Sequence, residues 1–213
     1  MAEIRWFGHN CFRIKAKEAT VLTDPVGKNT GYTLPKQTAD IVTLSHDHPG
    51  HNNLAAVKPD YQLINGPGEY EVHAVFLTGF RTYHDKEKGA EHGYNTIYLI
   101  EMSGLRLAHL GDLGHTLNDD QVETLGTIDV LFAPAGGGPL LSTSDMAEVI
   151  GRISPRMLIP MQYKAGKGDK KREEIDGFVR HLGVEMPTPV DKINVRQSDL
   201  TDQMQLVLLK PEG

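Results

Sequence analysis

The chain contains almost no cysteine and no long apolar segment. Cys11 is the single cysteine among 213 residues, which excludes an intrachain disulfide and indicates a reducing compartment. No stretch approaches eighteen apolar residues, and the first residues lack the apolar core of a signal peptide. We therefore expect a cytoplasmic protein that has no membrane partner.

Positive charge is also scarce. The formal net charge is −6, whereas binding to nucleic acid needs clustered lysine and arginine. The one basic run, residues 164–172, holds five cations and a single acid, Asp169. A solvated loop is favoured there over a local anion site. The composition therefore argues against a nucleic-acid partner.

The first half of the chain consists of short apolar runs that are typical of β-strands. Glycine, proline and polar residues separate these runs, as expected for turns. Residues 41–44 are apolar and β-branched and lead directly into Ser45-His46, which indicates a buried strand. The other expected strands are 4–7, 11–15, 19–22 and 61–64, one or two strands within 70–83, and a hairpin of 96–102 with 105–110; residues 54–57 are expected to form a short helix.

The second half alternates between strands and helices. Asn118 is a suitable N-cap for a helix over residues 118–125, because acidic residues follow it in the first turn. Such alternation is typical of α/β layering, and no linker or repeat interrupts the chain. We expect one domain, residues 1–213, of sheets with helices outside. The further expected elements are strands 128–132, 157–159 and 204–209 and helices 142–153 and 173–182.

Histidine is abundant, and its spacing is the strongest functional signal. Ten histidines occur in the chain, and His46, His48 and His51 fall within six residues. Residues two apart in an extended strand point the same way, so the imidazoles of His46 and His48 converge. Pro49-Gly50 then turns the chain and can bring His51 back toward them, where imidazoles suit a metal ion such as Zn, Fe, Mn or Ni. The alternative is a loop of exposed histidines without a role.

This strand followed by His-x-His-x-x-His resembles the metal-binding motif of the metallo-β-lactamase superfamily, which usually has the form His-x-His-x-Asp-His. The segment Gly8-His9-Asn10-Cys11-Phe12 is similar to the start of one branch, predicted metal-dependent hydrolases resembling L-ascorbate-6-phosphate lactonase. Further matching segments follow in the family's order over residues 4–163. The resemblance implies an α/β (α+β) fold, a four-layer αββα sandwich with the site at one edge.

The resemblance implies a complete first metal site. His46 and His48 belong to the motif itself, and Thr82-Tyr83-His84-Asp85 resembles the segment that gives the third histidine. His109-Leu110-Gly111-Asp112 resembles the strand that ends in a metal-bridging aspartate, although Gly-Asp is also a common turn pair. The implied cofactor is Zn²⁺ or Mn²⁺, held by His46, His48, His84 and Asp112.

The second metal site departs from the family pattern. Gly50 stands where the family usually has the motif's aspartate, and Gln162 stands where it usually has the last histidine. Only His51 and the shared Asp112 remain, so a mononuclear or weakly dinuclear centre is expected. His51 could bind a second metal or contact the substrate. Gln162 is expected to contact the substrate or support a ligand rather than bind metal.

The resemblance implies a hydrolase that acts on a small-molecule substrate. The metal would lower the pKa of a bound water, and the hydroxide would attack an ester, lactone, amide or phosphodiester. Asp112 would orient that water, and His51 or His115 would stabilise or protonate the departing group. One alternative is a degenerate member that binds metal or a ligand as a sensor or scaffold, because second-site ligands are lost. A nuclease is disfavoured by the acidic net charge.

Other residues are assigned roles around the metal centre. Asp24 is implied to support the ligand loop by accepting hydrogen bonds. His9 could line the pocket or cap a turn, and His109 is expected to be a hydrogen-bonded core histidine. Gly136-Gly137-Gly138 could cradle a phosphate or allow close backbone approach. The short chain leaves little for a lid, so we expect an open pocket or one completed by a neighbouring subunit of a homo-oligomer.

Overall fold

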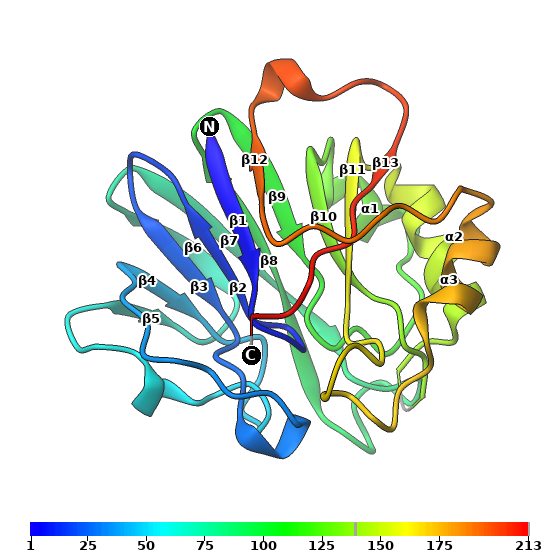
Figure 1. Cartoon of the computed structure of the whole chain (residues 1–213), viewed down its shortest axis with the longest axis horizontal. Helices are drawn as coiled ribbons and strands as arrows, with labels where there is room; N and C mark the ends of the chain where they lie inside the picture. Colours follow the sequence, from blue (N-terminus) through cyan, green and yellow to red (C-terminus); the bar gives the residue numbers. More distant parts are fainter. Residues whose placement is uncertain (139, 213) are drawn as a thin grey trace.

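Two β-sheets pack face to face in the molecule (Figure 1). The computed structural model describes residues 1–138 and 140–212. The first sheet contains, in spatial order, β12 (Ile193–Val195), β1 (Ala2–Trp6), β2 (Phe12–Lys15), β3 (Thr20–Thr23), β4 (Ile41–Thr43) and β5 (Gln62–Ile64). Neighbours from β12 to β3 are antiparallel, whereas β4 and β5 continue parallel to β3.

The second sheet has the same mixed character. In spatial order it contains β13 (Gln205–Leu206), β11 (Met157–Met161), β10 (Val130–Pro134), β9 (Leu105–His109), β8 (Tyr94–Met102), β7 (Val75–Tyr83) and β6 (Gly68–Val72). Strands β6 to β9 form antiparallel pairs, and β9, β10, β11 and β13 are parallel. The expected hairpin of the first half is therefore β8 with β9, and the 70–83 segment divides into β6 and β7.

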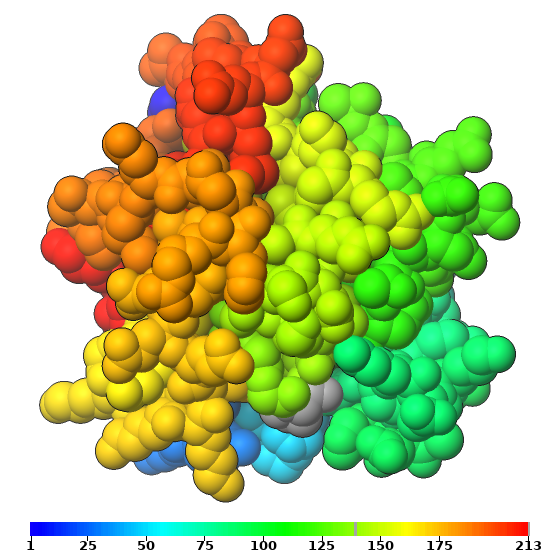
Figure 2. All heavy atoms as spheres, turned by 90° about the vertical axis from the view of Figure 1, so that its right-hand side faces the viewer, coloured from blue at the N-terminus to red at the C-terminus, as the bar shows by residue number. Residues whose placement is uncertain are grey.

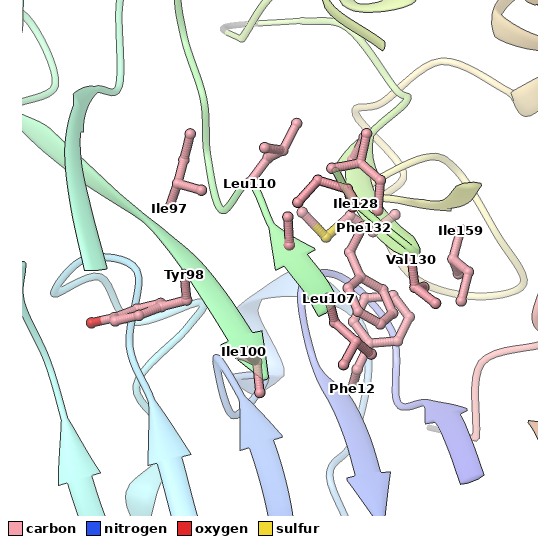
Figure 3. Close-up of a cluster of buried hydrophobic side chains, with 14 of the residues drawn as sticks. Phe12, Ile97, Tyr98, Ile100, Leu107, Leu110, Ile128, Val130, Phe132 and Ile159 are labelled. Atoms are coloured by element: carbon pink, nitrogen blue, oxygen red, sulfur yellow. The ribbon is translucent and has the colours of Figure 1, made fainter. Parts of the chain in front are cut away.

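The two sheets enclose one apolar core (Figure 3). Along β1, Ala2, Ile4 and Trp6 are fully buried, whereas the residues between them are half-buried. Phe12 of the first sheet meets Phe132 of the second, with ring centroids 4.5 Å apart. The period of two in the sequence thus decides which side chains face the opposite sheet.

Three α-helices, counted over the described residues, belong to the second half of the chain: α1 (Asp119–Leu125), α2 (Thr143–Ile153) and α3 (Ile175–Leu182). Helix α2 packs on α1, on α3 and on β10, and the three helices lie on the face seen in Figure 2. Asn118 caps α1 as expected, because its side chain accepts from the Gln121 backbone while the Gln121 side chain accepts from the Asn118 backbone.

The outer side of the first sheet has a different cover. The α/β class with two face-to-face sheets is confirmed, but no α-helix among residues 1–138 or 140–212 lies on this side. Instead, the loop over residues 24–39 and the 3₁₀ turn η2 (Leu54–Ala56) pack on outward residues such as Leu22 and Val42. The fourth layer is therefore a loop layer, and the short helix expected at 54–57 is only a 3₁₀ turn. Two further 3₁₀ turns are η1 (Lys28–Thr30) and η3 (Gln197–Asp199).

Two differences concern the end of the chain. The strand expected over 204–209 is limited to β13, which pairs with β11 for only two residues. The short strand β12 was not expected, since three residues are too few for a periodic signal. Within the described ranges, no helix is long and apolar enough to cross a membrane.

We expect Phe132→Ala to lower the free energy of unfolding by about 3–5 kcal/mol, because it removes a buried ring between the sheets. Phe76→Ala is the matched control, since Phe76 on β7 is 52% exposed and its loss should change stability by less than about 0.5 kcal/mol. Denaturant unfolding of both variants measures this difference. Equal losses would contradict the described core.

Candidate metal centre

Strands of both sheets deliver polar residues to one edge of the sandwich. Asp24 and His46 follow the parallel strands β3 and β4, while Asp112 and Gln162 follow β9 and β11. Parallel strands end on the same side of their sheet, so these side chains gather at one edge. This edge is at the bottom of Figure 1, where the loop after β3 (blue) meets the loop after β11 (yellow).

The histidines of the motif lie together with two residues distant in the sequence. Ligand atoms of His46, His48 and His51 all lie within 4.8 Å of one another, and those of His46, His84 and Asp112 do as well. His46 belongs to both groups, so the five side chains form one cluster. Members of this cluster could hold a divalent ion. His48 is grouped with His51 rather than with the expected partners His84 and Asp112.

His46 offers an open ligand atom. Its Nδ1 lies 3.0 Å from Ser45 Oγ, and its Nε2 is buried without a hydrogen-bond partner in the described chain. Buried polar atoms are nearly always partnered, so a cation fits this position. Burial lowers the pKa of His46 to about 4, which keeps the imidazole neutral at neutral pH, the form that binds metal.

His48 lies on the outer side of the cluster, where it is exposed. Its Nδ1 accepts a hydrogen bond from the Gly50 backbone at 3.1 Å. A neutral imidazole that accepts at Nδ1 carries its proton on Nε2, so His48 can bind metal through Nε2 only after this bond is released. A Cβ at Gly50 would lie 3.2 Å from the same Nδ1, so the glycine also makes room for this ring.

Asp24 is buried behind the ligand loop and ties it to β3. Its Oδ1 accepts from the Ser45 backbone at 2.7 Å, and its Oδ2 accepts from Ser45 Oγ at 2.6 Å and faces His51 Nδ1 at 3.3 Å. Burial favours the neutral acid, but the hydrogen bond and charge of His51 outweigh it and lower the pKa of Asp24. The carboxylate therefore directs the Nε2 of His51 toward the cluster.

Asp112 is fixed at the centre of the site by its neighbours. Its backbone N–H donates to Asn95 Oδ1 at 2.8 Å, and its Oδ2 lies 3.1 Å from His84 Nε2. Gly111 has a φ of 58°, and a Cβ there would lie 2.3 Å from Asn95 Oδ1, so this approach requires glycine. Burial would raise the pKa of Asp112, but His51 and the bond to His84 outweigh it and hold the pKa well below its usual range.

The other oxygen of Asp112 is occupied by amide donors. Asn10 Nδ2 donates to Oδ1 at 2.7 Å, and Gln162 Nε2 donates to the same atom at 2.6 Å. Gln162 Nε2 also lies 3.2 Å from His9 Nε2, while Arg172 donates to Gln162 Oε1 at 3.4 Å. Gln162 thus directs its NH₂ group to the atoms that a second cation would bind.

His9 lines the pocket instead of capping a turn. Its Nε2 lies 3.1 Å from His51 Nε2, and its Nδ1 lies 2.8 Å from Asp169 Oδ1. Asp169 is 7% exposed, although it belongs to the basic run that suggested a solvated loop. His9, Asp24 and Gln162 all have positive φ, a conformation that such residues retain only where surrounding contacts enforce it.

Two of the remaining histidines lie away from the cluster. His109 is 1% exposed, packs edge-on against Phe12 and donates from Nε2 to Asn10 O at 3.0 Å, as expected for a core histidine. His115 does not line the cavity, because its ring lies beside Tyr83 and its Nδ1 bonds to Thr116 O. The structure therefore does not bring His115 to the position that the expected catalytic role requires.

Asn10, Asn95 and Asp169 were missed by reasoning from the sequence. All three act through hydrogen bonds to residues that are far away in the chain. Only Asp169 carried a signal, as the single acid of the basic run. Gly136 supports the close-approach alternative for the glycine triplet, since a Cβ there would lie 2.1 Å from Gln162 O.

The cluster forms one wall of a cavity of about 950 Å³. His9, His46, His48, His51, His84 and Asp112 all line it. Residues of the η1 turn and of the loop after β11 form another part of its lining. A cavity of this size is typical of sites for small molecules.

Comparisons with known proteins agree with this geometry. The family profile described as "Beta-lactamase superfamily domain" matches residues 3–162. A UPF0173 protein of Pyrococcus abyssi is 29% identical over 201 residues, which cover 84% of this chain and 90% of the relative. A UPF0173 metal-dependent hydrolase of Thermococcus onnurineus is 25% identical over 192 residues, covering 76% of this chain and 85% of the relative.

A solved structure is similar over the whole chain. It is the crystal structure of a proposed zinc-dependent hydrolase of the metallo-β-lactamase superfamily from Thermotoga maritima. The two chains are 31% identical, each is covered over 99% of its length, and the TM-score is 0.81.

We expect Asp24→Asn to weaken Zn²⁺ binding by about 10- to 100-fold, because the residue orients His51 and the backbone of the ligand loop. Competition with a chromophoric chelator measures the affinity. Asp40→Asn is the matched control, since Asp40 also accepts a backbone hydrogen bond, from Thr20 at 2.7 Å, and does not line the cavity. Equal affinities of the two variants would rule out this role for Asp24.

Proposed function

The chain belongs to the metallo-β-lactamase superfamily, and from this premise we propose that it hydrolyses a small-molecule substrate with a single divalent metal ion. Several of its relatives are named metal-dependent hydrolases, and the chain is a hydrolase of this general kind. The substrate bond proposed is an ester, lactone, amide or phosphodiester. The number of metal ions and the roles of individual residues are proposals that rest on the cluster.

The proposed ligands are His46, His84 and Asp112, joined by His48 once its contact with Gly50 is released. The unpartnered Nε2 of His46 supports this set, because a cation would satisfy it. Zn²⁺ and Mn²⁺ are the candidates, and a set richer in imidazole than in carboxylate favours Zn²⁺. When bound, such an ion is a Lewis acid that lowers the pKa of water.

The proposal of one metal rests on Asp112. Bridging two metals through both of its oxygens would require Oδ1 as well as Oδ2, but Oδ1 already accepts hydrogen bonds from Asn10 and Gln162. Only Oδ2, which faces His84, remains for a cation. Gly50 has no side chain that could bind a second metal in place of Asp112 Oδ1.

His51 is proposed to move a proton during the reaction. It is fully buried, and although burial alone would lower its pKa, the charges of Asp112 and Asp24 outweigh burial and raise it. A raised pKa favours a proton on the ring, and its Nε2 lies 3.1 Å from His9 Nε2 and 3.6 Å from Asp112 Oδ1. This proton can be donated to the departing group of the substrate.

Protein purified without chelator should contain about one equivalent of divalent metal, because a second cation would have to displace the Gln162 amide. Gln162→His, combined with Gly50→Asp, should raise the content toward two equivalents. Mass-spectrometric metal analysis provides the measurement. Two tightly bound ions in the unaltered protein would refute the mononuclear proposal.

Metal-dependent turnover should appear in a screen of ester, lactone, amide and phosphodiester substrates, and His46→Ala should abolish it together with metal binding. His51→Gln should retain the metal while kcat falls by about 10²- to 10⁴-fold, since a proton donor is lost. His115→Gln is the control and should resemble the unaltered protein. A metal-loaded protein without turnover on any class would favour the sensor or scaffold alternative.

A further inference from the structure

The rim of the metal cavity is strongly basic. Besides the histidines, the cavity is lined by the η1 turn and by residues of the segment 167–172. The sequence favoured a solvated loop for the run 164–172, but four of its five cations lie on this rim. The cations that line the cavity are Lys28, Lys167, Lys170, Lys171 and Arg172.

The charges of this rim are not compensated by neighbouring acids. Over residues 1–138 and 140–212, no carboxylate lies within 4.0 Å of the charged nitrogens of these five side chains. Arg172 donates to Gly137 O at 2.8 Å and to Gln162 Oε1 at 3.4 Å, and both acceptors are neutral. By contrast, Lys164 of the same run pairs with Glu174 at 2.8 Å and does not line the cavity.

The acids of the same cavity do not neutralise the rim. Three acids line the cavity, Asp47, Asp112 and Asp169, against five cations, so positive charge is in excess there. The chain as a whole has a net charge of −6, so unpaired lysines gathered at one place are not a consequence of composition. The rim therefore presents a local positive field next to the proposed metal.

The basic rim is fixed in position by buried contacts. The Asp169 backbone donates to Thr30 O at 2.8 Å, which joins the basic segment to the η1 turn. The Asp169 side chain meets His9 Nδ1, and Tyr32 OH donates to Ala165 O at 3.1 Å. The lysines are thus mounted on a segment whose distance from the metal cluster is set by hydrogen bonds.

We propose that the substrate of this site is a small anion, a molecule that carries a phosphate or carboxylate group in addition to the bond that is hydrolysed. The rim cations bind the anionic group while the histidine cluster faces the reacting bond. This inference rests on the proposed function, because it takes the cluster as the place of reaction. The cavity volume suits a small molecule, and the acidic net charge disfavours a nucleic acid.

Equilibrium binding to the metal-free protein tests the proposal without relying on turnover. The probe is 3-phosphoglycerate, which carries both anionic groups, and neutral glycerol is its control. Calorimetry should show binding of 3-phosphoglycerate that weakens with salt. Lys170→Gln with Lys171→Gln should weaken it by about five- to tenfold, the expected effect of losing two exposed charge contacts. Lys164→Gln is the matched control and should leave the affinity unchanged.

The outcomes separate this inference from the proposed function. Zinc content should be the same in the double lysine variant and in the unaltered protein, since neither lysine touches the cluster. Absence of 3-phosphoglycerate binding, or equal affinity in all three proteins, overturns the anion proposal while leaving the metal proposal standing. Preferential binding of an RNA oligomer, lost in the same double variant, overturns it in favour of a polyanion. Failure to bind either Zn²⁺ or Mn²⁺, with 3-phosphoglycerate still bound, overturns the proposed function and leaves the rim only as an anion-binding site.

Discussion

Three buried carboxylates determine how this edge of the sandwich is built. Asp24, Asp112 and Asp169 are each less than a tenth exposed, and each meets a histidine. A buried charge is costly unless it is paired and hydrogen-bonded. The fold therefore requires the imidazoles, amides and backbone N–H groups that surround these acids. Some of the same side chains could bind a metal ion. A divalent cation in the cluster would relieve the same excess of negative charge.

Each of the three acids fixes a different part of the site. Asp24 joins β3 to the loop that carries His46, His48 and His51, and Asp112 holds the end of β9 against Asn10 and Gln162. The acids thus connect both sheets at the edge where their strands end. These hydrogen bonds also hold the backbones of residues with positive φ in that conformation, which is strained in the absence of such contacts.

The sequence predicted those features that depend on local spacing. The alternation of β1, the cap at Asn118 and the convergence of His46 with His48 follow from the geometry of a strand or helix. The amides of Asn10 and Asn95 could not be found in this way, because they meet Asp112 from positions 102 and 17 residues away. The loop that covers the first sheet could not be predicted either, because apolar side chains in an irregular segment show no periodic pattern.

Asp169 connects the basic rim of the cavity to the histidine cluster. One carboxylate oxygen meets His9, whose other nitrogen touches His51, while the Asp169 backbone holds the basic segment on the η1 turn. A displacement of the basic segment would therefore alter the hydrogen bonds of the histidine cluster, and the converse is also true. If the proposed substrate binds there, such a shared residue can align its anionic group with the reacting bond. Alignment of this kind lowers the entropic part of the activation barrier.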